Sequence, residues 1–267
     1  MSYRTLLTGL ADTETAPRVM AAASALANEH GAHVIALHVV PAGVTRESGA
    51  TIEDLAERLR EIYEEHRDGE SYSSEWCLLD DNELSATGAL IELGNACDAL
   101  VLGQRHAREA GRSRWHLGEH IVGVTARPVL LVPEGGERMS FGGRVLVAWD
   151  GGTASTRAVF DALPLLQRAT DVRVHRFNPP VEERRHVSGL AEGLAETLAR
   201  HEVALDLSNS TASRLEIGEE ILALADEWGA DVIVMGCHVH SRVRQFLLGD
   251  TTRHVFANTT RPLLMGA

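Results

Sequence analysis

The sequence predicts two tandem α/β domains, each built from parallel strands with helices on both faces of the sheet. Three observations predict this fold. The two halves of the chain repeat the same strand motifs in the same order. Within each half, short apolar runs alternate with longer segments of helical periodicity. Between the halves, the stretch from Pro133 to Gly143 has four glycines in eleven residues, as a flexible linker does.

Four pairs of segments carry the repeat. They are Asp98–Gly103 with Asp231–Gly236, Arg127–Leu131 with Arg261–Met265, Arg4–Leu7 with Arg144–Val147, and His33–Ala36 with Asp171–Val174. The pairs are offset by 133, 134, 140 and 138 residues, so the order is kept and the spacing nearly so. Chance similarity between apolar strands would not keep both. We therefore expect domains at residues 1–137 and 143–267.

Strands and helices are expected to alternate along each half. In the second half they are the strand Val145–Trp149, the helix Thr153–Leu166, the strand Val172–Phe177, the helix Leu190–Leu198, a third strand beginning near Ala204–Leu207, the helix Ile217–Trp228, the strand Asp231–Met235, the helix Thr252–Asn258 and the strand Pro262–Met265. The first half follows the same order through Leu6, Ala21–Ala27, Val34–Val40, Ile52–Tyr63, Ala89–Asn95, Leu100–Leu102 and Val129–Val132. This alternation predicts right-handed crossovers and a ligand site beyond the carboxyl ends of the strands, where strand order reverses.

Composition limits the class of protein. Hydrophobic residues make up 44% and charged residues 24%, which is typical of a globular chain. Apolar runs stay below the ~18–20 residues that cross a bilayer, and no secretion signal is visible, so we expect a cytoplasmic protein without a membrane partner. The net charge of −13 disfavours a nucleic-acid partner. Cys77, Cys97 and Cys237 have no CxxC spacing, which fits a reducing compartment.

A loop bounded by two glycines follows the strand that ends at Met235. It runs from Gly236 to Gly249, and a helix is expected to begin shortly after it. Glycine allows close backbone approach, and the free amides of a helix N-terminus favour an anion. We therefore expect a phosphate cradle. Arg242, Arg244 and Arg253 are expected to offer positive charge. Asp150 is expected to offer a hydrogen-bond acceptor to a base or sugar.

At these residues the chain resembles the universal stress protein family. The resemblance covers nearly the whole chain twice and is strongest at Val145–Gly151, Asp231–Gly236 and Leu248–Pro262. Members of that family have a five-stranded parallel, Rossmann-like α/β fold. Nucleotide-binding members carry a loop of the form G-x2-G-x9-G-[ST] after the fourth strand. The resemblance implies a stress-response regulatory protein whose second domain binds an adenine nucleotide, ATP or AMP, with or without magnesium.

The resemblance also implies how the site is divided. Asp150 would meet the adenine or its ribose, strand residues near Val174 would line the base pocket, and Gly236, Gly249 and the following residues would hold the phosphates. The complete set of expected site residues is Asp150, Gly151, Val174, Met235, Gly236, Val239, His240, Ser241, Arg242, Gly249, Asp250 and Thr251.

Two residues of this loop depart from the family pattern. Val239 occupies the middle glycine position, where a β-branched side chain restricts close approach. Asp250 occupies the Ser/Thr position and adds a negative charge. One like-charge contact at ~4 Å, with an effective dielectric constant near 20, costs roughly 4 kcal/mol unless an arginine or a metal intervenes. Thr251 offers a hydroxyl one residue further on.

The first domain departs further from the pattern. At the offset of 140, Leu10 stands where the second domain has Asp150. Gly249 lies thirteen residues before Pro262, and the residue thirteen before Pro128 is Trp115, not a glycine. We expect this domain to be structural or to bind another ligand.

Structural interpretations stand beside the functional ones. Asp150 fits a helix cap or turn as well as it fits a ligand contact. The arginines of the loop fit a solvated edge equally well. No metal site is expected, because Cys237, His238, His240, His116 and His120 have no second pair at ligand spacing.

Three functions compete. The leading one is an adenine-nucleotide sensor, and the alternative is a ligand-independent interaction scaffold that has lost nucleotide binding. An enzyme that transfers adenylate is disfavoured because no catalytic motif is visible, although weak ATP hydrolysis is left open. Tandem duplication predicts an internal pseudo-dimer of the two domains and leaves a homodimer of two chains open.

Overall fold

The computed structural model describes residues 2–40, 52–80, 85–104, 117–135, 141, 143–178, 189–211, 217–237, 239–240 and 247–266. Contacts divide the chain into two compact units, Ser2–Gly135 and Gly136–Ala267. This division falls inside the glycine-rich stretch that the sequence predicts as the joint. Within the described ranges, no helix has both the length and the apolar character needed to cross a membrane.

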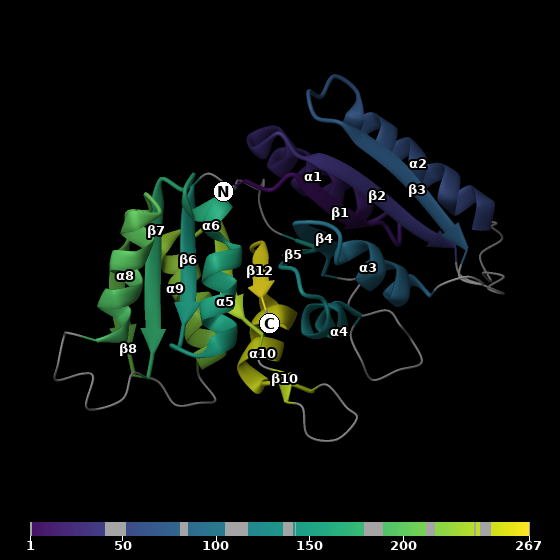
Figure 1. The fold of residues 1–267 in the computed structure, drawn as a ribbon. Helices are drawn as coiled ribbons and strands as arrows, with labels where there is room; N and C mark the ends of the chain where they lie inside the picture. The colour runs from purple at the N-terminus through teal and green to yellow at the C-terminus, as the bar shows by residue number, and fades with distance from the viewer. Residues whose placement is uncertain are drawn as a thin grey trace. The chain divides into compact units, whose positions relative to one another are not determined.

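The first unit is a parallel sheet covered by helices (Figure 1). Its elements are β1 (Thr5–Gly9), α1 (Ala16–His30), β2 (His33–Val40), α2 (Ile52–Arg67), β3 (Ser74–Asp80), α3 (Ala86–Gly94), β4 (Ala99–Gly103), α4 (Leu117–Val124) and β5 (Val129–Val132). The strand order is β3-β2-β1-β4-β5, and every pair is parallel. Strand order reverses at β1, which has β2 on one side and β4 on the other.

The second unit repeats this topology. Its elements are β6 (Arg144–Trp149), α5 (Thr153–Asp161), α6 (Leu163–Leu166), β7 (Asp171–Phe177), α8 (Leu190–Arg200), β8 (Asp206–Ser210), α9 (Ile217–Trp228), β9 (Val232–Gly236), β10 (Val239–His240), β11 (Leu247–Leu248), α10 (Asp250–Asn258) and β12 (Leu263–Gly266). The order is β8-β7-β6-β9-β12, again all parallel, and β10 pairs with β11 as a separate antiparallel hairpin. The predicted five-stranded, Rossmann-like sheets are confirmed.

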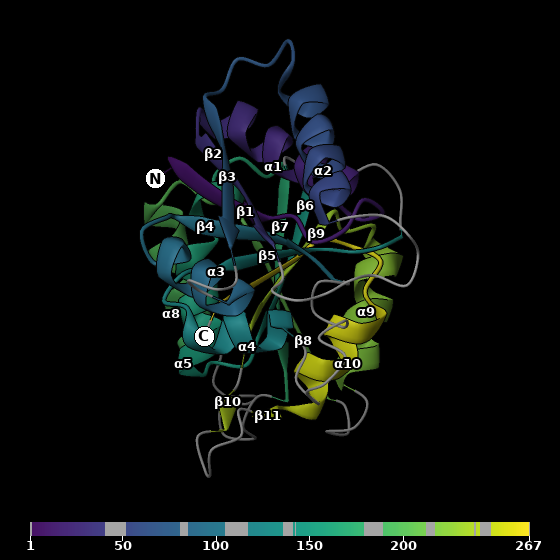
Figure 2. The ribbon, with the colours of Figure 1, turned by 90° about the vertical axis from the view of Figure 1, so that its right-hand side faces the viewer.

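The central strands lie between two layers of helices. All five residues of β4 and of β9 are buried, as their continuous apolar sequences predict. In the first unit α1 packs against α2, and α3 packs against α4. In the second unit α9 packs against α10, on the side of the sheet away from α5 (Figure 2). Both faces of each sheet are therefore covered, and the strand ends remain as the place for a site.

The sequence prediction was wrong in three places. The helix expected over Thr153–Leu166 is two helices, since Pro164 lacks an N–H and α5 ends before it. The third strand of the second unit, by contrast, begins at Asp206, inside the range expected for its start, and ends at Ser210. The strand Ser74–Asp80 and the hairpin β10–β11 were not expected.

The ladders also correct one offset between the halves. Thr5 pairs with His33, and Arg144 pairs with Asp171, so Thr5 and not Arg4 corresponds to Arg144. The strands β1 and β6 are therefore offset by 139 residues instead of 140. By this offset, Leu10 of the first unit is the counterpart of Trp149, and Ala11 is the counterpart of Asp150.

An aspartate before the fourth strand performs the same task in both units. In the first unit, Asp98 Oδ2 accepts hydrogen bonds from the amides of Arg4 at 2.7 Å and Thr5 at 2.9 Å. In the second unit, Asp231 Oδ2 accepts one from the amide of Arg144 at 2.7 Å. Because these amides begin an inner strand, the shared Asp motif is explained by strand capping and needs no ligand.

Candidate functional site

The carboxyl end of β6 carries Asp150, which holds the start of helix α5. Asp150 is exposed, and its Oδ1 accepts hydrogen bonds from the amide of Gly152 at 2.8 Å and from Ser155 Oγ at 2.5 Å. Between them, Gly151 adopts the left-handed region at φ 83°, which a side chain would strain. The capping interpretation of Asp150 is thus realised in the structure. Oδ1 is occupied by the protein's own donors.

Arg176 lies at the neighbouring strand end and was missed by the sequence analysis. It is the register partner of Trp149, its side chain is buried, and its guanidinium stacks over the Trp149 ring at 5.4 Å. A Cβ on Gly151 would lie 3.3 Å from Arg176 Nη2, so the guanidinium borders the turn after Asp150. The expected base-pocket residue, Val174, is instead fully buried in the sheet. Two residues further along the same face of β7, Arg176 is the side chain at the strand end, next to Trp149 and Gly151.

Gly236, at the end of β9, has a packing explanation. A Cβ there would lie 2.3 Å from the backbone nitrogen of Ser155 and 2.5 Å from the carbonyl carbon of Ala154. Real Cβ atoms do not approach backbone so closely, so only glycine fits. The preceding residue, Met235, is buried as well. The close approach expected of this glycine is made to helix α5.

The loop after β9 is closed at its base by a short hairpin. Val239 pairs with Leu248, and His240 pairs with Leu247, in antiparallel fashion. Gly249 follows directly and is the N-cap of α10. The pairing therefore ties the N-terminus of α10 to the end of β9. The structure describes only the backbone of Val239 and His240, while His238, Ser241, Arg242 and Arg244 lie outside the described residues.

The first turn of α10 is open and carries a compensated charge. Among the residues that the structure describes, none has an atom within 4 Å of the place of a Cβ on Gly249. The side chain of Asp250 is 85% exposed, and its Oδ1 lies 3.6 Å from Arg253 Nη1. Thr251 is partly exposed. Asp250 therefore does not fill a cavity, and an arginine stands beside it, so its repulsion of an anion is nearer the ~1 kcal/mol of a solvated pair than the larger cost of a buried one.

The equivalent strand ends of the first unit are closed in a different way. Leu10 is buried, and the buried ring of His38 meets the Leu10 carbonyl oxygen through Nδ1 at 2.8 Å. By register, His38 corresponds to Arg176. Asp12 caps α1, since its carboxylate accepts from the amide of Thr15 at 2.8 Å and from its hydroxyl at 2.9 Å. Trp115 and the loop around it lie outside the described residues.

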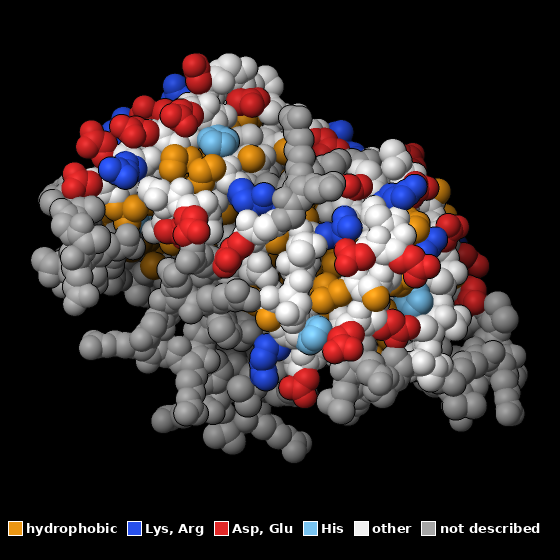
Figure 3. Space-filling view, turned by 180° about the vertical axis from the view of Figure 1, so that it is seen from behind, with side chains coloured by type: hydrophobic (Ala, Val, Ile, Leu, Met, Phe, Trp, Pro, Cys, Tyr) orange, Lys and Arg blue, Asp and Glu red, His pale blue; other side chains and the backbone are white. Residues whose placement is uncertain are grey.

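Metal and thiol chemistry find little support in the described part of the chain. It contains no group of three or more His, Cys, Asp or Glu side chains that could hold a metal ion. All three cysteines are free, and burial raises the pKa of the Cys77 and Cys97 thiols. Cys237 is buried. The face in Figure 3 shows acidic side chains spread over the described surface, with basic ones between them.

Comparison with known proteins bears on the second unit above all. The universal stress protein family model matches residues 143–265. A universal stress protein of Synechocystis is 26% identical over 183 residues, which are 66% of this chain and 60% of that protein. Another, of Methanocaldococcus jannaschii, is 36% identical over 47 residues, which are 18% of this chain and 29% of that protein. The match thus spans less than two thirds of either relative.

Solved structures resemble the chain over nearly its full length. A universal stress protein of Archaeoglobus fulgidus matches with a TM-score of 0.61 at 14% identity. The match covers 97% of this chain and 95% of that protein's chain. A protein of the same kind from Pseudomonas aeruginosa has a TM-score of 0.60 at 18% identity and covers 99% and 93%. These likenesses support the fold of both units. The C-terminal unit thus matches the universal stress protein family model over residues 143–265.

Proposed function

We propose that the protein is a stress-response regulatory protein that binds an adenine nucleotide, ATP or AMP, at the carboxyl ends of β6, β7 and β9. The observation that carries the proposal is the hairpin β10–β11, which ties the open N-terminus of α10 to the end of β9. The hairpin therefore holds the free backbone amides at the start of α10 near the end of β9, and such amides favour a phosphate.

The charges around the strand ends support an anionic ligand. Two helices, α5 and α10, begin there, and helix N-termini favour negative charge. Arg176 and Arg253 add positive charge to a chain whose net charge is −13. Local potential decides the binding of a small anion, so the overall acidity does not oppose it. The proposed role is binding that alters a surface, without turnover.

The second candidate function is a ligand-independent scaffold. It is favoured because residues expected to bind the nucleotide also have structural roles. Gly236 is required by its packing on α5, and Asp150 by its cap on the same helix. Both residues would be retained in a protein that binds no nucleotide. Loss of the middle loop glycine to Val239 agrees with this alternative.

Titration calorimetry of the full chain with ATP and AMP, with and without magnesium, separates the two. A sensor gives saturable binding that Asp150→Ala weakens at least about ten-fold, the equivalent of ~1.4 kcal/mol. Asp12→Ala is the matched control, because it removes a similar helix cap from the other unit. Absence of heat at millimolar nucleotide supports the scaffold. Phosphate release faster than that of a Gly249→Trp variant would point to an enzyme.

A further inference from the structure

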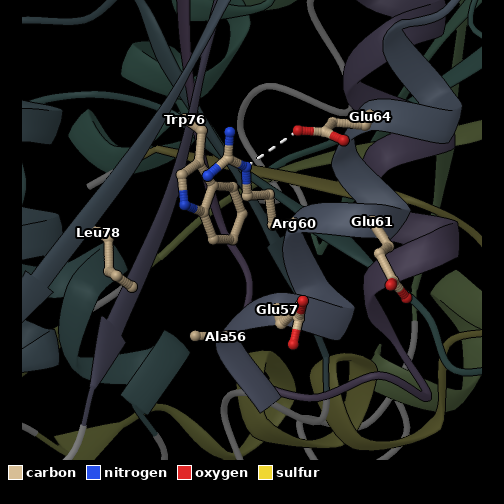
Figure 4. A pocket seen from close by; sticks show the side chains of 7 residues that line it. All are labelled: Ala56, Glu57, Arg60, Glu61, Glu64, Trp76 and Leu78. Atoms are coloured by element: carbon tan, nitrogen blue, oxygen red, sulfur yellow. Dashed lines mark hydrogen bonds and ion pairs between the residues drawn. The ribbon is translucent and has the colours of Figure 1, made fainter. Parts of the chain in front are cut away.

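A pocket of about 470 Å³ lies between helix α2 and strand β3 in the first unit (Figure 4). It is remote in sequence from every residue of the nucleotide loop, and its existence does not depend on the function proposed for that loop. Strand β3 is the outermost strand of its sheet, and in the described part of the chain it pairs with β2 alone. The backbone groups on its other side are therefore a template for a further strand.

The strand side of the pocket is apolar. Trp76 and Leu78 are two residues apart on β3, so both point to the face that α2 covers. Leu78 is 50% exposed, an unusual fraction for a leucine beside a helix. The indole of Trp76 packs against the rings of Tyr63 and His38, with centroid distances of 5.7 Å and 6.5 Å, respectively. The indole is thus positioned by packing and faces the pocket with its exposed part.

The helix side of the pocket is acidic. Glu57, Glu61 and Glu64 line it, and Arg60 is the single cation among the lining residues (Figure 4). Arg60 Nε donates to Glu64 Oε1 at 3.0 Å, which neutralises that pair. Neither Glu57 nor Glu61 forms a hydrogen bond or ion pair with any residue that the structure describes. Two uncompensated carboxylates therefore stand beside an aromatic and aliphatic surface.

The corresponding strand of the second unit differs at the two apolar positions that line this pocket. Trp76 pairs with Ala36, and Leu207 pairs with Val174, so Leu207 is the counterpart of Trp76 and Asn209 that of Leu78. The same fold is thus built without the indole and with a polar residue in the second position. Leu207 is also apolar and 41% exposed, so what distinguishes the first unit is the larger indole of Trp76 with a second exposed apolar residue, Leu78, beside it.

We propose that this pocket and the open edge of β3 bind an extended segment of a partner protein in which Lys or Arg alternates with apolar residues. Addition of such a segment as a strand beside β3 would place every second side chain over Trp76 and Leu78. A guanidinium there meets both the indole face and the carboxylates of Glu57 and Glu61. Apolar side chains of the segment cover Leu78. An acidic or neutral segment would leave the two carboxylates without partners.

Fluorescence anisotropy with a labelled synthetic peptide of alternating arginine and leucine tests this proposal on the full chain. We expect saturable binding at about 150 mM salt, where exposed long-range attraction is largely screened. A peptide with glutamate in place of arginine should not bind. Glu57→Gln/Glu61→Gln should weaken binding about five-fold, because it removes the two carboxylates that an arginine would contact. Leu78→Lys should weaken binding about ten-fold, because it removes an apolar contact and adds a charge that repels arginine.

The matched control is Glu219→Gln/Glu227→Gln, which removes two exposed carboxylates from helix α9 of the second unit. It changes the net charge by the same amount and should leave the peptide affinity unchanged. Equal weakening by this control would mean general attraction to an acidic protein and would overturn the proposal. So would a lack of saturable binding, or binding that Leu78→Lys does not weaken while circular dichroism shows the variant folded.

Discussion

The guanidinium of Arg176 lies over the ring of Trp149, with 5.4 Å between its central carbon and the ring centroid. The two residues are register partners at the adjoining ends of β7 and β6. Stacking on the indole fixes the plane of the guanidinium. A buried positive charge is thus oriented beside Asp150, at the point of the sheet where the family resemblance implies a base pocket.

Replacing Arg176 by glutamine should weaken ATP binding at least about ten-fold, because a charged donor contributes ~1.5–3 kcal/mol to a hydrogen bond. Titration calorimetry measures the change. Arg173→Gln is a matched control, since Arg173 stacks on Trp228 at 4.6 Å near the other end of the same strand. An unchanged affinity in Arg176→Gln, with binding intact in the wild type, would show that the stack only packs the strand end.

The two glycines of the loop should respond in opposite ways to substitution. Gly236→Ala places a Cβ against the backbone of α5 and should destabilise the protein by about 3 kcal/mol or more. Gly249→Ala meets no atom of the described residues within 4 Å and costs about 1 kcal/mol at most, as a poorer N-cap residue. Urea unfolding followed by circular dichroism distinguishes them. Similar losses in both variants would contradict the packing explanation of Gly236.

The sequence predicted the inner strands well because burial on both faces leaves an unmistakable apolar run, as in β4 and β9. It missed the edge strand β3, because this strand mixes polar and apolar residues with no strict period. The hairpin β10–β11 has two residues per strand, too few for any period to show.

The site was predicted less well than the fold. An alternating pattern shows which residues share a face of β7 but not how far the strand extends, so Val174 was chosen although Arg176 is the residue of that face at the strand end. The pairing of Arg4 with Arg144 was one residue in error because both precede similar apolar runs. Only the hydrogen-bonded ladder fixes that register. The capping role of Asp150 was correctly held open, since ligand contact and capping need the same residue type.

His175 should make stability depend on pH. It is buried between Ser208 and Ser210, whose hydroxyls lie 2.9 Å from Nδ1 and Nε2, respectively. Burial lowers the pKa of His175 below 6.5, which outweighs the opposing effect of Glu220. The unfolded chain then binds the proton more tightly. The free energy of unfolding should be level above about pH 6.5 and fall at lower pH.

Urea unfolding between about pH 7.5 and pH 5.5 measures this effect, because the two values bracket the ordinary range of histidine. His175→Gln keeps a donor and an acceptor but cannot titrate. Its stability should therefore fall less steeply than that of the wild type over the same interval. Parallel curves for the two proteins would mean that His175 does not contribute to the acid sensitivity.

The variant Asp250→Ser distinguishes the sensor from the scaffold through two measured changes, one in stability and one in ATP affinity. The carboxylate of Asp250 lies in the first turn of α10, where the helix dipole favours it by ~0.3–1 kcal/mol, so the variant should be slightly less stable. If phosphates lie at this helix end, removal of a solvated like charge should strengthen ATP binding about three- to five-fold.

Asp206→Ser is the control, because it removes an exposed carboxylate from the edge strand β8 of the same unit. It should leave ATP affinity unchanged, since β8 lies two strands away from β6. Calorimetry and urea unfolding together give both quantities for each variant. A destabilised Asp250→Ser protein with no gain in affinity would place the ligand elsewhere. Loss of stability and gain of affinity in the same variant would be difficult to explain unless an anion is bound at the first turn of α10.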